Sequence, residues 1–139
     1  MGRISATSTN LKRMVKLYSV LHVEDSNSWL RLIKSCIQEV DSKLPLTQTI
    51  DYYGAVKYLE EKKFALYILD GDFPGPGEKQ GLELYNYIVK KYGPKEGEKC
   101  VFVSTDDELE QICRNLNVVF WHKSKFNMDK FVDFLKSMH

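Results

Sequence analysis

The strongest constraint on this chain is a dense apolar run that ends in two aspartates. The run covers residues 64–69, FALYIL, and Asp70 and Asp72 follow it before a Pro/Gly-rich break begins. Such a continuous apolar segment predicts a strand buried on both faces, as in the middle of a parallel sheet. Asp70 would then lie at the carboxyl end of this strand, the edge where parallel α/β sheets place their binding groups. Taken alone, this stretch favours a turn aspartate that accepts hydrogen bonds from its own backbone, so the ends of the other strands must decide.

Strand and helix patterns alternate along the whole chain. Short apolar runs predict strands at residues 17–23, 46–50, 64–69, 100–103 and 118–121. Apolar residues at helical spacing predict helices at residues 29–40, 55–62, 82–92, 109–116 and 128–138. Strands that alternate with helices pair in parallel through right-handed crossovers. The sequence therefore predicts an α/β fold of the (βα)5 type, with a doubly wound five-stranded parallel sheet in three layers.

Local signals predict where several helices begin. The cluster at residues 26–28 can cap the first helix, and Asn127 can cap the last one. Thr105 together with Glu108 fits a capping box before the fourth helix. The charged connector at residues 95–99 is interpreted as an ordinary solvated loop.

Length and composition exclude several classes of protein. A chain of 139 residues with 43% apolar residues fits one domain with a real core. We predict a flexible tail at residues 1–14, without the apolar core of a signal peptide, and one domain at residues 15–139. The formal charge of +1 gives no basic footprint for nucleic acid, and no apolar run approaches the roughly 20 residues that span a bilayer. Three widely spaced cysteines, Cys36, Cys100 and Cys113, indicate buried thiols in a reducing compartment, so we expect a cytoplasmic protein.

Polar side chains follow four of the five predicted strands at the point where each strand ends. They are Glu24 and Asp25 after the first strand, Asp70 and Asp72 after the third, Ser104 and Thr105 after the fourth, and Lys123 after the fifth. Because the carboxyl ends of parallel strands share one edge of the sheet, we expect these side chains to converge. A solvated surface explains any one of them but does not explain the set.

Crowded carboxylates favour a bound cation, and hard oxygen ligands with room for water suit Mg²⁺. An aspartate beside Mg²⁺ can attack phosphorus and form an aspartyl phosphate. Transfer would then depend on positioning and on neutralising the three equatorial oxygens. The sequence offers Mg²⁺, the Lys123 ammonium and the Ser104 hydroxyl for these three oxygens.

As an ordered set, these residues resemble the receiver domain of bacterial two-component response regulators, over about residues 17–138. That family has an acidic pair after the first strand, a phosphoacceptor aspartate after the third, a Ser or Thr after the fourth, and an aromatic residue three positions before a lysine. The matching residues here are Glu24 and Asp25, Asp70, Ser104, and Phe120 with Lys123; Phe73 and Pro74 match the hydrophobic-Pro step after the acceptor.

The resemblance implies the flavodoxin-like strand order 2-1-3-4-5 and a stand-alone switch. It implies that Asp70 accepts a phosphoryl group from a sensor histidine kinase or a phosphotransfer protein. Its Mg²⁺ would be held by Glu24, Asp25, Asp70 and the backbone carbonyl of Asp72. The domain would not be an enzyme toward other molecules and would catalyse only its own phosphorylation and dephosphorylation.

The resemblance also implies a switch pair, in which the Ser104 hydroxyl moves to the phosphate and Phe120 turns inward behind it. The signal would pass to a downstream protein target or onward through a phosphorelay, without direct contact with nucleic acid or membrane. A homodimer through the last helices and strands is left open.

Four features depart from the family pattern. Ser124 replaces the proline that usually follows the lysine, and Thr105 replaces a small residue after the switch hydroxyl. The loop after Asp70 is extended at residues 75–80, and the Asp72 side chain adds negative charge. These departures leave open a receiver-like interaction module that is not phosphorylated. A haloacid-dehalogenase-like phosphatase, suggested by the DxD of Asp70 and Asp72, is a further alternative.

The remaining histidines and tryptophans have simpler interpretations. We expect His22 to be a core or interface histidine and His122 to lie at the surface. Trp29 is expected to serve packing. Trp121 fits either core packing or a partner-binding face.

Overall fold

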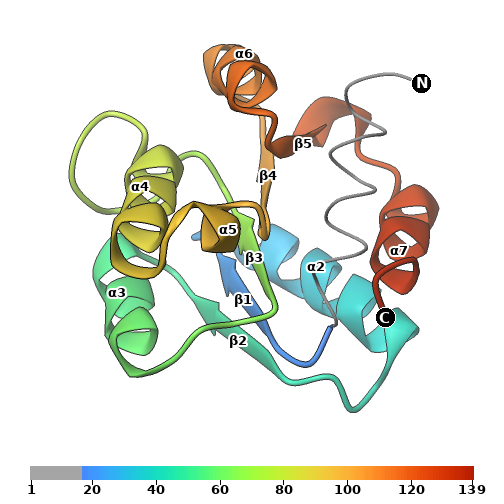
Figure 1. Ribbon diagram of the computed structural model, residues 1–139. Coiled ribbons are helices and arrows are strands. Elements are labelled where there is room, and N and C mark those ends of the chain that lie inside the picture. The colour runs from blue at the N-terminus through green and yellow to red at the C-terminus, as the bar shows by residue number, and fades with distance from the viewer. Residues whose placement is uncertain (1–16) are drawn as a thin grey trace.

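The computed structural model describes residues 17–139, which form one α/β unit (Figure 1). Its sheet has five parallel strands in the order β2-β1-β3-β4-β5. They are β1 (Val20–Val23), β2 (Leu46–Thr49), β3 (Leu66–Leu69), β4 (Cys100–Ser104) and β5 (Val119–His122). The predicted fold class and the strand order 2-1-3-4-5 are confirmed. The tail predicted at residues 1–14 lies outside the described residues.

Helices cover both faces of the sheet and complete three layers (Figure 1). They are α2 (Asn27–Val40), α3 (Tyr52–Glu61), α4 (Gln80–Tyr92), α5 (Pro94–Gly97), α6 (Asp107–Leu116) and α7 (Met128–Lys136), with a short 3₁₀ turn η1 (Lys123–Lys125). α2 and α7 pack in the core on one face, and α3, α4 and α6 pack in the core on the other. None of the helices among residues 17–139 is long and apolar enough to cross a membrane.

The central strand β3 explains why the sheet needs two covered faces. Leu66 and Ile68 pack in the α2/α7 core, whereas Tyr67 and Leu69 pack in the α3/α4/α6 core. Successive side chains of a strand point to opposite faces, so a strand that is apolar at every position is stable only between two layers. All four residues are fully buried, and the strand delivers Asp70 to the carboxyl edge of the sheet.

The start of α6 differs from the predicted capping box. Asp106 is the N-cap residue, and its Oδ1 accepts a hydrogen bond from the Leu109 amide at 3.0 Å. The prediction that Thr105 and Glu108 form the cap was therefore wrong by one residue. Asp is as good an N-cap as Thr, and β4 continues through Ser104, so the helix begins one residue later. Glu108 instead pairs with Lys79, with Nζ–Oε1 at 2.9 Å.

The other two predicted caps have different outcomes. Asn127 caps α7, since its Oδ1 accepts a hydrogen bond from the Lys130 amide at 3.0 Å. Ser26 occupies the N-cap position of α2, but its side chain makes no capping hydrogen bond. Its hydroxyl lies 3.0 Å from the Ser28 hydroxyl instead.

The connector at residues 95–99 was wrongly predicted to be a solvated loop. Its first residues belong to α5, and Glu96 is 4% exposed. The Tyr67 hydroxyl donates to Glu96 Oε2 at 2.6 Å, and Lys99 Nζ lies 3.1 Å from Glu96 Oε1. A buried carboxylate is tolerated when it is paired and hydrogen-bonded, which these two partners provide.

His22 is a core histidine, as predicted. It is 1% exposed in β1, and its Nδ1 lies 3.1 Å from the side-chain amide of Gln48. That amide also donates to the Leu30 carbonyl at 2.8 Å. Burial, and then the nearby Lys123 ammonium, lower the pKa of His22 to about 3, so the ring is neutral and structural.

Candidate functional site

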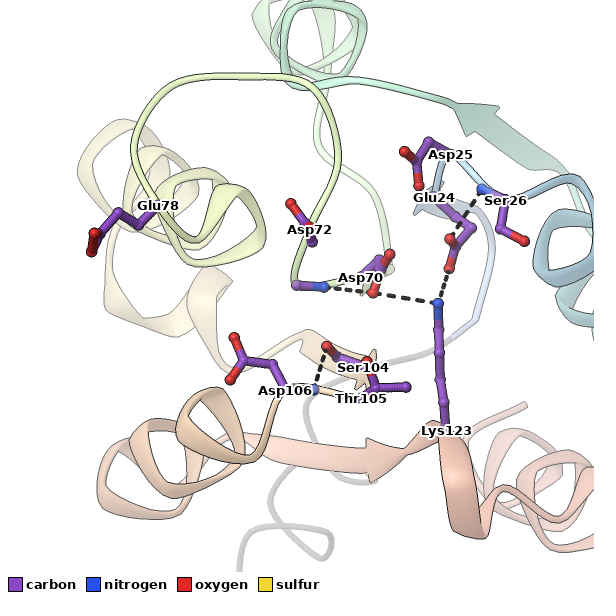
Figure 2. A pocket seen from close by; sticks show the side chains of 11 residues that line it. Glu24, Asp25, Ser26, Asp70, Asp72, Glu78, Ser104, Thr105, Asp106 and Lys123 are labelled. Carbon is purple, nitrogen blue, oxygen red and sulfur yellow. Dashed lines mark hydrogen bonds and ion pairs between the residues drawn. The ribbon is translucent and has the colours of Figure 1, made fainter.

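Four strand ends and the loops after them meet in one cavity, as the sequence predicted (Figure 2). The cavity has a volume of about 350 Å³ and is lined by Glu24, Asp25, Ser26, Asp70, Gly71, Asp72, Glu78, Ser104, Thr105, Asp106 and Lys123. The parallel ladder sets this arrangement. The Asp70 amide donates to the Val23 carbonyl at 3.0 Å, which places Asp70 beside Glu24. Ser104 pairs in register with His122, which places Ser104 beside Lys123.

Asp70 is one of two buried carboxylates in the cavity, with Glu24. It is 7% exposed, and its Oδ1 accepts a hydrogen bond from the Gly71 amide at 2.8 Å. Burial and the neighbouring Glu24 carboxylate raise the pKa of Asp70 to about 7, against the opposing effect of Lys123. Burial and Glu24 therefore favour the protonated form of Asp70 more than water does. Cations in the cavity favour its charged form.

Lys123 enters the cavity from the end of β5 and joins two carboxylates. Its Nζ lies 2.9 Å from Glu24 Oε1 and 3.5 Å from Asp70 Oδ1. Glu24 is 1% exposed, and its second oxygen accepts a hydrogen bond from the Ser26 amide at 3.2 Å. A buried ion pair of this kind is costly to break, because either partner left alone is an uncompensated charge.

The predicted metal ligands include a compact oxygen set. Glu24, Asp25 and Asp70 each offer a carboxylate oxygen, and these oxygens all lie within 4.8 Å of one another. Two of the three residues are buried, while Asp25 is exposed at the rim. Hard oxygen donors beside open solvent fit Mg²⁺, which keeps several waters in its shell. Asp72 lines the same cavity with an exposed side chain, and the ligand role of its backbone carbonyl stays a prediction.

Ser104 lies against the peptide that follows Asp70. A Cβ atom built on Gly71 would lie 2.7 Å from Ser104 Oγ, so any larger residue there would require the Ser104 hydroxyl to move. The Ser104 hydroxyl is buried and accepts a hydrogen bond from the Asp106 amide at 3.1 Å. The neighbouring Thr105 is exposed at the rim of the cavity.

Phe120 lies outside the cavity lining. It is half-buried in β5, pairs in register with Phe102, and packs on the α3/α4/α6 core. Its ring centroid is 6.1 Å from that of His122. Its role as a switch partner of Ser104 stays a prediction.

Sequence reasoning missed three charged residues around the cavity. Glu78 and Asp106 line it, and Lys79 bridges the loop after Asp70 to the start of α6, with Nζ–Oδ2 of Asp106 at 2.6 Å. Asp106 could have been found as a strong N-cap residue next to the strand end. Glu78 and Lys79 lie in a polar loop that carries no periodic signal.

The fold is that of response-regulator receiver domains, as comparison with solved structures shows. The chemotaxis response regulator CheY4 of Vibrio cholerae is 19% identical with a TM-score of 0.66, and the match covers 89% of this chain and 100% of that one. The response regulatory domain of protein mrkE from Klebsiella pneumoniae is 17% identical with a TM-score of 0.70, over 86% and 93% of the two chains. A CheY-like receiver domain protein from Methanospirillum hungatei JF-1 is 18% identical with a TM-score of 0.68, over 87% and 92%.

Sequence comparisons found no such match. No protein-family model matches this chain. A search of curated proteins likewise found no match. The likeness therefore rests on the fold and on the residues at its carboxyl edge.

Proposed function

We propose that this chain is a receiver domain that accepts a phosphoryl group on Asp70 and acts as a signalling switch. One observation carries the proposal: in this fold, a buried carboxylate at the end of β3 faces both an acidic pair and a lysine. Sites of this composition suit phosphoryl transfer, which needs a nucleophile, a cation and neutralised oxygens more than it needs acid–base chemistry.

The transfer step uses groups already in the cavity. An oxygen of ionised Asp70 attacks the phosphorus of a donor phosphohistidine and forms a P–O bond. The P–N bond breaks, and its electron pair stays on the imidazole nitrogen of the donor. Lys123 and Ser104 donate N–H and O–H bonds to phosphoryl oxygens. Mg²⁺, held by Glu24, Asp25, Asp70 and the Asp72 backbone carbonyl, would supply the remaining positive charge.

The same proposal covers the partners. The donor is a sensor histidine kinase or phosphotransfer protein, and the recipient of the signal is a downstream protein target or a further relay protein. Ser104 and Phe120 are the proposed switch pair. The chain would turn over no other substrate, because its chemistry ends with its own acyl phosphate and the hydrolysis of that bond.

Phosphate uptake from a small donor tests the proposal. The full chain is incubated with Mg²⁺ and acetyl phosphate, and its intact mass is measured. We expect one added phosphoryl group, lost in Asp70→Asn and retained in the matched control Asp72→Asn, which removes the exposed carboxylate two residues away. No uptake by folded wild-type protein, or equal uptake by Asp70→Asn, would refute it.

The charge of the cavity favours a second candidate, a receiver-like interaction module that is not phosphorylated. Six of the lining residues are acidic, and Lys123 is the basic one among them. This excess negative charge opposes a phosphoryl dianion unless cations neutralise it. An absence of uptake at saturating Mg²⁺ would favour this candidate. Steady hydrolysis of many phosphomonoesters would instead favour the phosphatase alternative.

A further inference from the structure

The turn that carries Lys123 is short, and Ser124 follows the lysine. β5 ends at His122, and Lys123–Lys125 form the single 3₁₀ turn η1. The Phe126 amide closes the turn by donating to the Lys123 carbonyl at 3.3 Å. Side chains from two other elements also contact this turn.

His122 holds the backbone of this turn from one side. Its Nδ1 accepts a hydrogen bond from the Ser124 amide at 3.2 Å, and its Nε2 lies 2.8 Å from Asp107 Oδ1. A backbone amide can only donate a hydrogen bond, so Nδ1 is the acceptor. Nε2 therefore carries the ring proton and donates a hydrogen bond to Asp107. Asp107, Glu110 and His122 cluster closely enough to suggest a metal site. A metal-bound histidine normally donates a hydrogen bond from its other nitrogen, however, and here that nitrogen accepts one.

Trp29, in the first turn of α2, contacts the turn from the other side. The Lys123 ammonium lies 4.8 Å from the centroid of the Trp29 ring. The same ring packs edge-on against Phe126, with centroids 5.2 Å apart at an interplanar angle of 83°. Trp29 therefore contacts residues at both ends of the turn, and its π face meets the ammonium directly.

Within residues 17–139, the ammonium contacts Glu24 at 2.9 Å, Asp70 at 3.5 Å and the indole face of Trp29 at 4.8 Å. The two carboxylates compete with a phosphoryl group for its positive charge. The indole attracts the ammonium through its quadrupole but carries no net charge, so it orients the cation without neutralising it. Indole is also the strongest of the aromatic side chains in this interaction.

We propose that Trp29 is a positioning residue for phosphoryl transfer, which holds the Lys123 ammonium at the Asp70 carboxylate by a cation–π contact. The inference rests on the proposed function for its role in transfer, while the contact itself can be measured without phosphorylation. The role of Trp29 then goes beyond the packing that its sequence position suggested.

Kinetics with matched variants test the role in transfer. Trp29→Leu keeps an apolar contact with Phe126 and removes the π face, and Trp29→Phe restores a weaker face. We expect the acetyl phosphate rate to fall about five- to thirty-fold in the leucine variant and less in the phenylalanine variant. Mg²⁺ affinity should change less than about two-fold, because the variant keeps Lys123 and all the proposed carboxylate ligands. The control is Trp121→Phe, which alters the other tryptophan, packed on Phe126, Phe131 and Phe134.

A purely structural role predicts a different pattern. The rate would then follow the melting temperature across all three variants, and phenylalanine would give no rescue beyond its effect on stability. That result, or an unchanged rate in Trp29→Leu, would overturn the proposal.

An NMR measurement keeps the two proposals distinguishable. In wild-type protein without any phosphoryl donor, the ring current of Trp29 should move the Cε protons of Lys123 upfield, and Trp29→Leu should remove this displacement. Ordinary lysine shifts in the wild type would overturn the inference even if Asp70 is phosphorylated. A clear upfield shift in a protein that takes up no phosphate would support the contact and refute the proposed function alone.

Discussion

Removing the charge of Asp70 should stabilise the protein when no metal is present. Asp70→Asn keeps the size of the side chain and removes a carboxylate whose pKa is raised to about 7 by burial and by Glu24. A raised pKa in the folded state means that folding favours the protonated form. The stability that protonated Asp70 contributes to the fold is fully present below pH 3.8, its ordinary pKa. This stability is lost as the pH rises through about 7.

The size of the effect follows from this difference in pKa. Ionising Asp70 in the folded protein costs at most about 4 kcal/mol more than ionising it in the unfolded chain, at 1.36 kcal/mol for each pH unit. The variant recovers less than this, because the repulsion between the two carboxylates also acts on Glu24 and because Lys123 loses Asp70 as an ionic partner. We therefore expect asparagine to recover about 1–3 kcal/mol at pH 8.

Urea unfolding in EDTA at pH 5.5 and pH 8 measures this prediction. The wild type should lose stability between the two values, and Asp70→Asn should lose much less and be the more stable protein at pH 8. Saturating Mg²⁺ should reduce the difference in stability between wild type and Asp70→Asn at pH 8, because it stabilises the charged form of the wild type. The control Asp72→Asn, with an exposed carboxylate, should stay within about 0.5 kcal/mol of the wild type. Equal pH dependence in wild type and Asp70→Asn would refute the reasoning.

Three further substitutions test the packing and charges of the site. Lys123→Gln should raise Mg²⁺ affinity several-fold in a calorimetric titration, because Glu24 loses its cationic partner, and should lower the acetyl phosphate rate at least ten-fold; unchanged Mg²⁺ affinity would contradict the ion pair. Gly81→Ala should destabilise the fold by about 1–3 kcal/mol, because its Cβ would overlap the Asp70 carbonyl oxygen. Gly93→Ala is the comparison: nothing lies within 4 Å of its Cβ, but φ is +100°, so its cost reports backbone strain without overlap. Asp106→Ala should cost about 1 kcal/mol in urea unfolding through loss of the α6 cap, whereas Glu108→Ala should cost less than about half of that; the reverse order would restore the predicted capping box.

The sequence predicted what depends on periodicity and topology. β3 could be predicted because each of its residues is apolar, and the meeting of Glu24, Asp70, Ser104 and Lys123 followed from parallel pairing alone. What it did not predict depends on partners that are distant in sequence. The burial of Glu96 requires Tyr67, 29 residues away, and charge alone argued for solvent.

Details at element ends were also beyond the sequence. The choice of Asp106 over Thr105 as the α6 cap turns on whether β4 ends one residue earlier or later, and both residues are good caps. The contacts that hold the Lys123 turn depend on the orientations of the Trp29 and His122 side chains, which no local sequence pattern predicts.

The Lys79 ion pair has a consequence for how a docking protein would sense the site. Lys79 fastens the extended loop to Asp106, and the Asp106 amide in turn donates to the Ser104 hydroxyl. Loop, helix start and hydroxyl thus form one linked chain of contacts. Suppose that a ligand binds the loop more tightly when Ser104 is in one of two arrangements. Because coupling between sites is reciprocal, binding of that ligand must also shift Ser104 toward the same arrangement. For a protein bound at this loop, the contacts from Lys79 through Asp106 to Ser104 would therefore couple binding to the arrangement of the Ser104 hydroxyl.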